Sequence, residues 1–391
     1  MAVNNMTKEQ VYTITNLLAQ EAQAVTNLTV TDYSSFISVA NSILAVGTEK
    51  ALSSLMNVIQ RTIIAVRPYD EKFKGLEMTG DQWGAITRKI SFADRYTEEE
   101  DAYTDAVTDG ATVDPWTIRK PNVLETRYYG SDVMSAHYTV YDYQLREAFT
   151  SPENLGAFIS GMMIHFQNER VQWLEVLKKG LLVNAIATKQ ALNQDVVNLR
   201  TEYNTETGLN LTLQDIYKPD NFKPFFDWAY SRVAKVSREF TSRSQKYQEV
   251  ITGKPIMRHT PYQDQRVYML AEFLEQISSR VYANTYHDNF LTLADVEAVD
   301  FWQALNSPGS INAKPVYINA SAEIVEAENA VELNNVVGII FDRDAMGYNI
   351  YNDMLASTPL NPRGLYYNIF SHLDVRLGQD FTEKICIFTL N

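Results

Sequence analysis

Two carboxylates at the end of one apolar stretch are the residues best placed for chemistry. Asp342 and Asp344 directly follow 336–341, a run of apolar residues typical of a buried strand. A strand that delivers two carboxylates to its end can hold a divalent metal ion, because carboxylate oxygens are the ligands that Mg²⁺ prefers. This arrangement would make the protein a metal-dependent phosphatase or glycosyltransferase that uses Asp342 and Asp344.

The surrounding sequence favours a structural role for these two carboxylates. The chain ends at residue 391, which leaves too few residues after Asp344 for the lysine and further carboxylates that phosphatase chemistry requires. A glycine-rich nucleotide-binding motif does not precede the pair either. The preferred hypothesis is that Asp342 or Asp344 caps a short helix that begins near Ala345.

Other reactive groups are scattered along the chain. The sequence contains no G-x-S-x-G, P-loop, G-x-G-x-x-G, H-E-x-x-H or C-x-x-C motif. The single cysteine, Cys386, excludes an intramolecular disulfide and a cysteine-based zinc site, and we interpret it as a buried strand residue. The five histidines are far apart and share no helical ligand spacing: His137, His165, His259, His287 and His372. The sequence therefore predicts no cofactor.

Composition limits the possible partners. A 45% hydrophobic content in 391 residues is enough for several domains. The formal charge of −14 argues against tight non-specific binding of nucleic acid, which needs many Lys and Arg residues. The first residues do not resemble a signal peptide, and no stretch approaches the ~18 apolar residues of a membrane span. We therefore expect a protein that is kept in the cytoplasm or released by lysis.

One long helix organises the middle of the chain, and the sequence predicts it over 151–192. Ser151 is a favourable N-cap, Pro152 lies where its missing N–H costs nothing, and Glu153 complements the helix dipole. A helix of this length is a rod of ~60 Å, which suits a flat or extended subunit better than a compact domain. Its expected apolar stripe is Leu155, Phe158, Met162, Phe166, Trp173, Leu177 and Leu181, with Lys178 and Lys179 largely outside it.

The N-terminal part reads as a helical arm, residues 1–66. Apolar residues at helical spacing predict helices over Lys8–Gln23, Tyr33–Leu44 and Lys50–Ile64. Their apolar faces are narrow, so three such helices cannot form a large core alone. We expect the arm to lie on its own body or on a neighbouring subunit.

Residues 67–130 are expected to form an extended flap, with a long hairpin over 84–130. An acidic run at its tip is either a solvated loop or a surface that docks on a basic patch of a neighbouring subunit. The charged residues of the flap are Glu98, Glu99, Glu100, Asp101, Asp105, Asp109 and Asp114, followed by Arg119 and Lys120. The most basic region surrounds a helix predicted over Pro224–Gln245 and contains Arg232, Lys235, Arg238, Arg243, Lys246, Lys254, Arg258 and Arg266.

The remaining chain contains both strands and helices, as an α+β fold does. Residues 193–219 are polar and mark a boundary, and 210–344 reads as a mixed module. Further elements are predicted at Tyr128–Tyr143, Val267–Ala271, Glu272–Tyr286, Val316–Ile318, Val336–Phe341, Gly364–Phe370 and Lys384–Leu390.

The C-terminal part resembles a known family. Phe341–Gly347 (FDRDAMG) and Asn361–Asn368 (NPRGLYYN) are similar to the end of major capsid proteins of tailed phages. The resemblance is to podovirus-type phages of Gram-positive bacteria and related gut phages, and it extends upstream through Lys120–Val123 and Leu145–Phe158.

The resemblance implies the Hong Kong 97-type capsid fold. Its parts would be the arm 1–66, the extended loop 67–130, a peripheral domain 131–209 with spine helix 151–192, the axial domain 210–344, and a return to the peripheral domain over 345–391. It also implies a major capsid protein without enzymatic activity, which forms pentamers and hexamers of an icosahedral shell.

The resemblance further implies partners and a location. The shell would surround double-stranded DNA without sequence-specific binding, in the virion, after assembly in the bacterial host cytoplasm. We expect a separate scaffolding protein, a portal, noncovalent stabilisation and no membrane. A tail or surface structural protein is a third hypothesis.

One turn is a candidate assembly element, Asn361-Pro362-Arg363-Gly364. Pro362 fixes φ, Gly364 provides conformational freedom, and Arg363 offers a forked donor for a carboxylate. The hypothesis is that Arg363 anchors the return of the chain into the closing sheet or into a neighbouring subunit.

Overall fold

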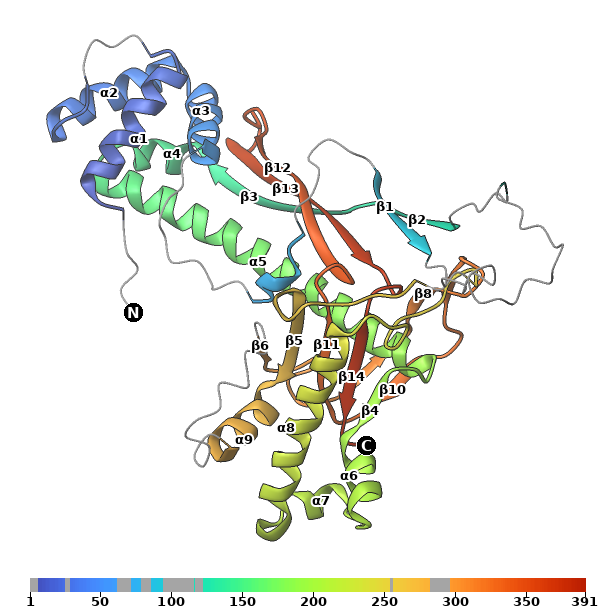
Figure 1. Ribbon diagram of the computed structural model, residues 1–391. Coiled ribbons are helices and arrows are strands. Elements are labelled where there is room, and N and C mark those ends of the chain that lie inside the picture. The colour runs from blue at the N-terminus through green and yellow to red at the C-terminus, as the bar shows by residue number, and fades with distance from the viewer. Residues whose placement is uncertain are drawn as a thin grey trace.

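The computed structural model describes residues 6–24, 29–61, 72–78, 86–93, 116, 122–253, 256–281 and 296–391. These residues form a helical lobe and a body, which are joined by one long helix and one long antiparallel sheet (Figure 1). In these ranges no helix is both long enough and apolar enough to cross a membrane.

Helix α5, Pro152–Ala191, runs from the helical lobe into the body and confirms the long helix predicted over 151–192. The Ser151 hydroxyl accepts the backbone N–H of Asn154 at 3.1 Å, as its N-cap role requires. The first half of α5 contributes Leu155 and Ile159 to the core of the helical lobe, and the second half contributes to the core of the body. The helix therefore belongs to both cores.

Lys178 corrects the predicted polar face of α5. Its side chain is fully buried, although the sequence places it outside the apolar stripe. Its ammonium group donates to the Lys72 carbonyl oxygen at 3.2 Å and lies 4.4 Å from the ring centroid of Tyr348. Residues distant in the sequence cover this side of the helix, and helical periodicity carries no information about them.

The helical lobe consists of α1 (Lys8–Glu21), α2 (Tyr33–Val46), α3 (Thr48–Arg61) and α4 (Asp142–Ala148) around the first half of α5. The three predicted arm helices are confirmed, and they lie on their own chain. Lys8 pairs with Glu153 at 2.8 Å, and the buried hydroxyls of Thr48 and Tyr367 are 2.7 Å apart. Capping boxes at Thr7 and Asp32 begin α1 and α2.

A three-stranded antiparallel sheet connects the lobe to the body, in the order β12-β13-β3. One face packs against α5 and contributes Val140 and Ile369 to the core of the helical lobe. The strands are β3 (Asp132–Tyr141), β12 (Met346–Ser357) and β13 (Tyr366–Gln379).

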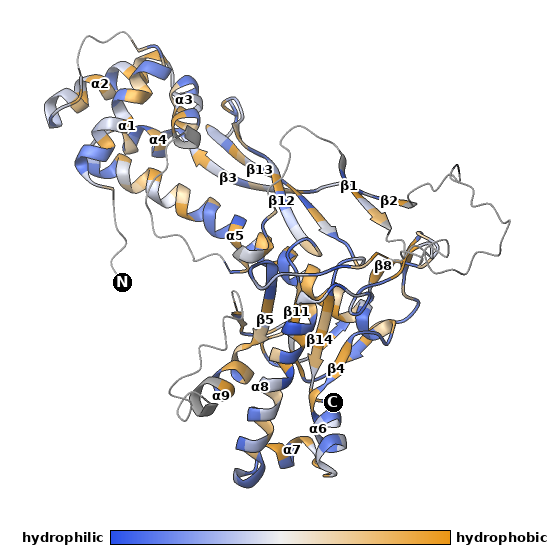
Figure 2. Ribbon diagram, in the orientation of Figure 1, coloured by the Kyte–Doolittle hydropathy of each residue, from blue (hydrophilic) through white to orange (hydrophobic). Residues whose placement is uncertain are grey.

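The body is built on a five-stranded sheet in the order β4-β14-β11-β5-β6. Strand β14 is parallel to β4 and antiparallel to β11, so the last strand of the chain lies inside this sheet. Hydrophobic residues concentrate along β11 and β14, and Cys386 is buried there as predicted (Figure 2). The strands are β4 (Val196–Asn198), β5 (Gln265–Leu270), β6 (Val296–Val299), β11 (Val336–Asp342) and β14 (Ile385–Thr389).

Helices and short strands surround the body sheet. The helices are α6 (Leu199–Thr207), α7 (Leu213–Ile216), α8 (Pro219–Thr241) and α9 (Ala271–Val281), with the 3-10 turns η1 (Lys74–Leu76) and η3 (Tyr262–Asp264). Two small antiparallel pairs join β7 (Ile311–Ala313) to β10 (Val331–Leu333) and β8 (Val316–Ile318) to β9 (Ile324–Glu326).

Three sequence predictions differ from this part of the structure. Helix α8 begins at Pro219, ahead of the predicted start at Pro224. Pro219 occupies the first turn, where its missing N–H costs nothing, and Pro224 lies inside the helix. The polar stretch 193–219 contains β4, α6 and α7. No helix begins near Ala345, since a tight turn leads directly from β11 into β12.

The hairpin, defined as β1 (Ile86–Ala93) and β2 (Asn122–Tyr129), confirms the two arms of the predicted flap. The strands pair antiparallel with Lys89 opposite Thr126 and Phe92 opposite Val123. The acidic tip and the basic residues Arg119 and Lys120 lie outside the described residues.

Candidate assembly site

Asp342 and Asp344, the sequence candidates for metal chemistry, lie in different surroundings. Asp342 is buried, its Oδ2 accepts the Thr260 hydroxyl at 2.6 Å, and its Oδ1 accepts the Asp344 N–H at 2.8 Å. Asp344 is exposed and lies 3.6 Å from the Arg343 guanidinium. Asp342 thus closes a turn instead of capping a helix.

The electrostatics of Asp342 follow from its burial. Loss of solvent raises the pKa of Asp342 above its ordinary value, although hydrogen bonds from Thr260 and Asp344 oppose the shift. In the part of the chain that the structure describes, no three His, Cys, Asp or Glu side chains are placed to share a metal ion. Both oxygens of the buried Asp342 carboxylate already accept hydrogen bonds from the chain.

A cavity of ≈ 560 Å³ opens beside Asp342. Its walls carry both signs of charge, and Arg343 pairs with Asp264 at 3.2 Å across it. The lining also includes Arg258 and Glu383, which connect the cavity to the hairpin. This mixed lining is typical of a solvated charge network and does not favour one ligand charge.

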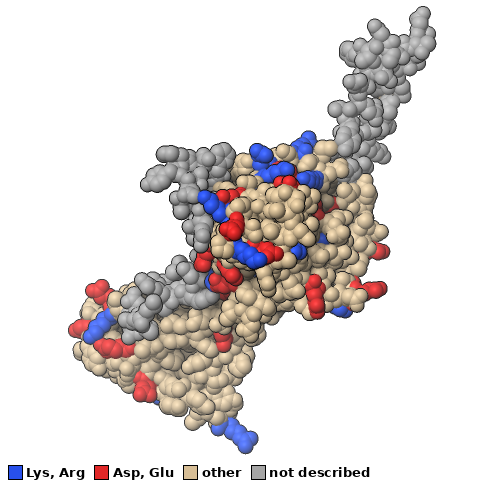
Figure 3. Space-filling model, turned by 90° about the horizontal axis from the view of Figure 1, so that it is seen from below, with Lys and Arg blue, Asp and Glu red and all other residues tan. Residues whose placement is uncertain are grey.

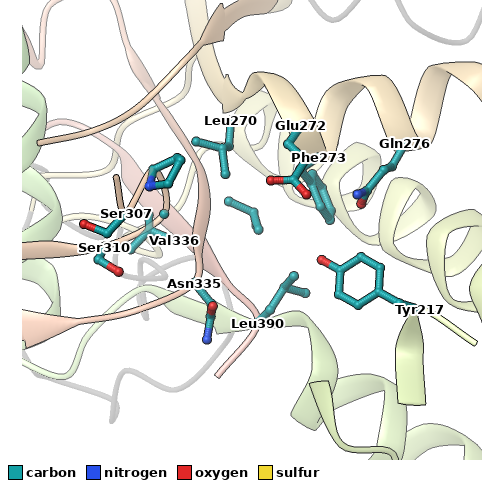
Figure 4. A pocket seen from close by; sticks show the side chains of 13 residues that line it. Tyr217, Leu270, Glu272, Phe273, Gln276, Ser307, Ser310, Asn335, Val336 and Leu390 are labelled. Atoms are coloured by element: carbon teal, nitrogen blue, oxygen red, sulfur yellow. The ribbon is translucent and has the colours of Figure 1, made fainter. Parts of the chain in front are cut away.

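A second cavity of ≈ 270 Å³ lies at the end of the body sheet, between α9 and the end of the chain (Figure 4). Tyr217, Glu272 and Gln276 line one side of it, and Leu390 lies between them and Asn335. Among the described residues that line the cavity, Glu272 is the single carboxylate and none is a histidine, cysteine or lysine. These described lining residues do not include a nucleophile paired with a base.

The inner face of the hairpin takes part in a charge cluster beside the first cavity. Lys89 Nζ lies 2.8 Å from Asp380 Oδ2 and 2.6 Å from Glu383 Oε1. Both carboxylates are buried in the turn between β13 and β14. One hairpin lysine therefore bridges two buried acids of the body.

Two further contacts hold the inner face of the hairpin on the body, and together with the Lys89 ion pairs we call them the seat of the hairpin. The Arg258 guanidinium donates to the Ser91 hydroxyl at 2.8 Å and lies 3.2 Å from Glu383 Oε1. Tyr128 of β2 packs over Gly378, where an added Cβ would come within 3.1 Å of the tyrosine ring. The seat thus combines ion pairs with a steric notch.

The pKa values of Asp380 and Glu383 are shifted in opposite directions. Burial alone would raise the pKa of Asp380, but Lys89 and Thr382 hold it below its ordinary value. Burial raises the pKa of Glu383, and the opposing effect of Lys89 is insufficient to reverse it. Asp380 is therefore the stronger anionic partner of Lys89.

The outer face of the hairpin is exposed and mixed, because the charged residues Arg88, Glu125 and Arg127 share it with the apolar Ile90 and Phe92. Ile90 and Phe92 alternate with Lys89 and Ser91 along β1, and their exposed fractions are 60% and 64%. These two exposed apolar side chains are candidates for a contact with another chain. The alternation of charged and apolar residues in β1 was visible in the sequence, but the partners of Lys89 were not.

The turn at 361–364 is organised by Asn361. Its Oδ1 accepts the N–H groups of Arg363 and Gly364 at 3.0 and 3.2 Å, and its Nδ2 donates to the Tyr366 hydroxyl at 3.0 Å. The left-handed backbone lies at Leu365, φ 51°, and not at Gly364 as the predicted freedom implied. Gly364 is required for space, because a Cβ there would lie 2.4 Å from the Tyr366 ring.

The Arg363 side chain is exposed, and no carboxylate among the described residues pairs with it. Exposed cations also follow the outer side of α8 at Lys235 and Arg238. Other members of the predicted basic region are neutralised within the chain, as Arg232 is by Glu202 and Lys246 by Glu239. The visible face in Figure 3 accordingly shows both signs of charge.

Comparisons with known proteins agree with a structural role. A profile of the family described as Phi29-like phage major capsid protein matches residues 3–389. No curated protein matches the chain.

Two solved structures share its fold. The capsid structure of Staphylococcus phage Andhra is similar with 11% identity and a TM-score of 0.55, over 84% of this chain and 87% of that one. The structure of head fiber and inner core protein gp22 of native bacteriophage P68 is similar with 12% identity and a TM-score of 0.55, over the same shares.

Proposed function

Because this chain belongs to the Phi29-like phage major capsid protein family, we propose that its copies form the pentamers and hexamers of an icosahedral shell. This shell would enclose the double-stranded DNA of a tailed phage. The family match over residues 3–389 is the observation that carries the proposal. The shell-forming role is that of the family, and the similar phage structures share the fold of this chain.

The proposed division of labour follows the order of the chain. Residues 1–66 act as the arm and 67–130 as the extended loop, while 131–209 and 345–391 make the peripheral domain. Residues 210–344 act as the axial domain that meets its symmetry mates at the fivefold and sixfold axes. Strand β14 departs from a strict division, since it completes the sheet of β5 and β11.

The hairpin is proposed to contact a neighbouring copy. Exposed Ile90 and Phe92 supply apolar area, and the charges Glu98, Glu99, Glu100, Arg119 and Lys120 of the flap supply electrostatic contacts. The exposed cations Lys235 and Arg238 on α8 of a neighbouring copy offer a surface of opposite charge for Glu98, Glu99 and Glu100. Net attraction between copies would then weaken as salt concentration rises.

Arg363 is proposed to pair with a carboxylate of a neighbouring copy. The Asn361 hydrogen bonds and Pro362 hold the loop, so the exposed guanidinium projects from an ordered turn. An Arg fork on a rigid loop loses less entropy when it binds a carboxylate. An Arg363→Ala protein that assembles as well as wild type would remove this contact from the proposal.

Further partners follow from the shell. We propose assembly in the bacterial host cytoplasm with a separate scaffolding protein and a portal, and a final location in the virion capsid. The packaged DNA would be enclosed without sequence-specific binding, which the charge of −14 favours.

Negative-stain microscopy of the expressed chain, alone and with a scaffolding protein, tests the proposal. Shells or capsomer rings are expected. Tubes or fibres would indicate a tail or surface protein. A small discrete oligomer with magnesium-dependent phosphatase or glycosyltransferase turnover that Asp342→Asn abolishes would overturn the capsid role.

A further inference from the structure

The seat of the hairpin is a small set of specific contacts centred on Lys89. A single lysine reaches two buried carboxylates, and each has a second partner within the body, which for Glu383 is Arg258 at 3.2 Å. Asp380 Oδ1 accepts the Thr382 N–H and hydroxyl at 2.9 and 2.6 Å, and the Asp380 N–H donates to the Ala345 carbonyl oxygen at 2.7 Å. The acids are therefore pre-positioned, while the lysine arrives from another segment.

The hairpin depends on this seat because a two-stranded sheet is marginally stable alone. The inner-face residues Lys89 and Ser91 contact the body, whereas the outer-face residues Ile90 and Phe92 remain exposed. The contacts that hold the hairpin are thus concentrated at Lys89, Ser91 and Tyr128.

We propose that Lys89 is a latch: its pairing with Asp380 and Glu383, supported by Tyr128 in the Gly378 notch, docks the hairpin on its own subunit, and its release frees the hairpin to move as a unit. Arg258 is the second, weaker tie through Ser91 and Glu383. The docked and released states share the same body fold.

A pivot for this motion lies at the end of β2. Gly130 separates β2 from β3 and has φ +89°, a backbone conformation that other residues rarely adopt. The Arg376 Nε–H donates to its carbonyl oxygen at 3.3 Å, so the pivot is attached to β13. Strand β3 is paired with β13 along its length and does not need to move with the hairpin.

The latch determines the direction in which Ile90 and Phe92 on the outer face of the hairpin point. With Lys89 docked, Ile90 and Phe92 face away from their own body and are available to another chain. The consequence for assembly rests on the proposed function, but the latch is a property of a single chain. The two can therefore fail separately.

Hydrogen exchange of the unassembled full-length chain tests the latch. Lys89→Met keeps the length of the side chain and removes the ammonium group. We expect amides of β1 and β2 to exchange at least tenfold faster, while those of β12 and β13 are unchanged. Arg88→Met is the matched control, because this neighbouring cation is exposed on the outer face. It is expected to leave the exchange rates unchanged.

A second variant acts from the body side. Gly378→Ala places a methyl group 3.1 Å from the Tyr128 ring and leaves Lys89 intact. Gly378→Ala is expected to accelerate exchange in the same two strands. Lys89→Arg, which keeps the positive charge, is expected to retain most of the protection that Lys89→Met loses. Equal effects of Lys89→Met and Arg88→Met, or unchanged exchange in both Lys89→Met and Gly378→Ala, would overturn the latch. Failure of the wild-type chain to form shells would count against the proposed function alone.

Discussion

Lys189 Nζ lies 2.7 Å from Asp195 Oδ2, and the lysine side chain is completely buried. Glu249 accepts from the same ammonium group at 2.8 Å. The cluster joins the last turn of α5 to the loop before β4 and to the loop after α8. It ties the end of α5 to the body through charge, in addition to the apolar packing of the same half of the helix.

Replacing Lys189 by Met is expected to destabilise the chain by about 3–5 kcal/mol. The change leaves two carboxylates facing each other in a buried site without their cation. Urea unfolding of the unassembled protein, followed by circular dichroism, measures the loss. Lys218→Met is the control, because Lys218 pairs with Asp215 at 2.6 Å on the open surface. An equal shift of the urea midpoint in both variants would contradict this account.

Two glycines are expected to respond to alanine with opposite signs. At Gly347, in β12, an added Cβ would lie 2.6 Å from the Leu76 carbonyl oxygen, so Gly347→Ala is expected to cost about 1–3 kcal/mol. At Gly180, within α5, nothing lies within 4 Å of the added atom. Gly180→Ala is expected to stabilise the helix by ~0.5–1 kcal/mol. Thermal unfolding of both variants checks the signs.

Asp342→Asn is expected to be tolerated or stabilising at pH 7. Burial raises the folded-state pKa of Asp342 above its unfolded value, so the folded chain binds the proton more readily. Stability therefore falls as pH rises from the unfolded pKa, near ~3.9, through the folded pKa. The amide can still accept from the Asp344 N–H, and the Thr260 hydroxyl can turn to accept from it.

The test of Asp342 is a comparison of urea midpoints at pH 4 and pH 7. The advantage of Asp342→Asn over wild type is expected to be larger at pH 7 than at pH 4. A variant that is markedly less stable than wild type at pH 7 would show that the fold needs this negative charge.

Removing the apolar side chains of the outer hairpin face is expected to impair assembly without unfolding the chain. Ile90→Ser and Phe92→Ser change exposed positions, so the free energy of unfolding is expected to stay within about 0.5 kcal/mol. Sedimentation velocity with the scaffolding protein is expected to show fewer shells and more free subunits. Wild-type yields of shells from the double variant would place the contact between copies elsewhere.

Local signals in the sequence predicted the helices well. Ser151 and Pro152 located the start of α5, and the periodicity of apolar residues located α1, α2 and α3. Both arms of the hairpin and the buried strand of Cys386 were also predicted. These features depend on neighbours within a few residues, which a sequence displays directly.

The candidate assembly site was predicted less completely, because its contacts join distant segments. Lys89 meets Asp380 across 291 positions, and Lys178 meets Lys72 across 106. Sequence periodicity assigns a lysine to the surface unless its buried partner is known. The role of Arg363 and of the flap charges remains a prediction, since it concerns contacts between copies.

Strand β14 pairs with β11 on one side and with β4 on the other, so residues 385–389 complete the middle of the body sheet. During synthesis these residues leave the ribosome after almost everything they must pair with. A nascent chain that stops before Ile385 would leave the edges of β4 and β11 open and Val336 and Ile339 uncovered. The body sheet can therefore be completed only after the chain has been translated through this strand.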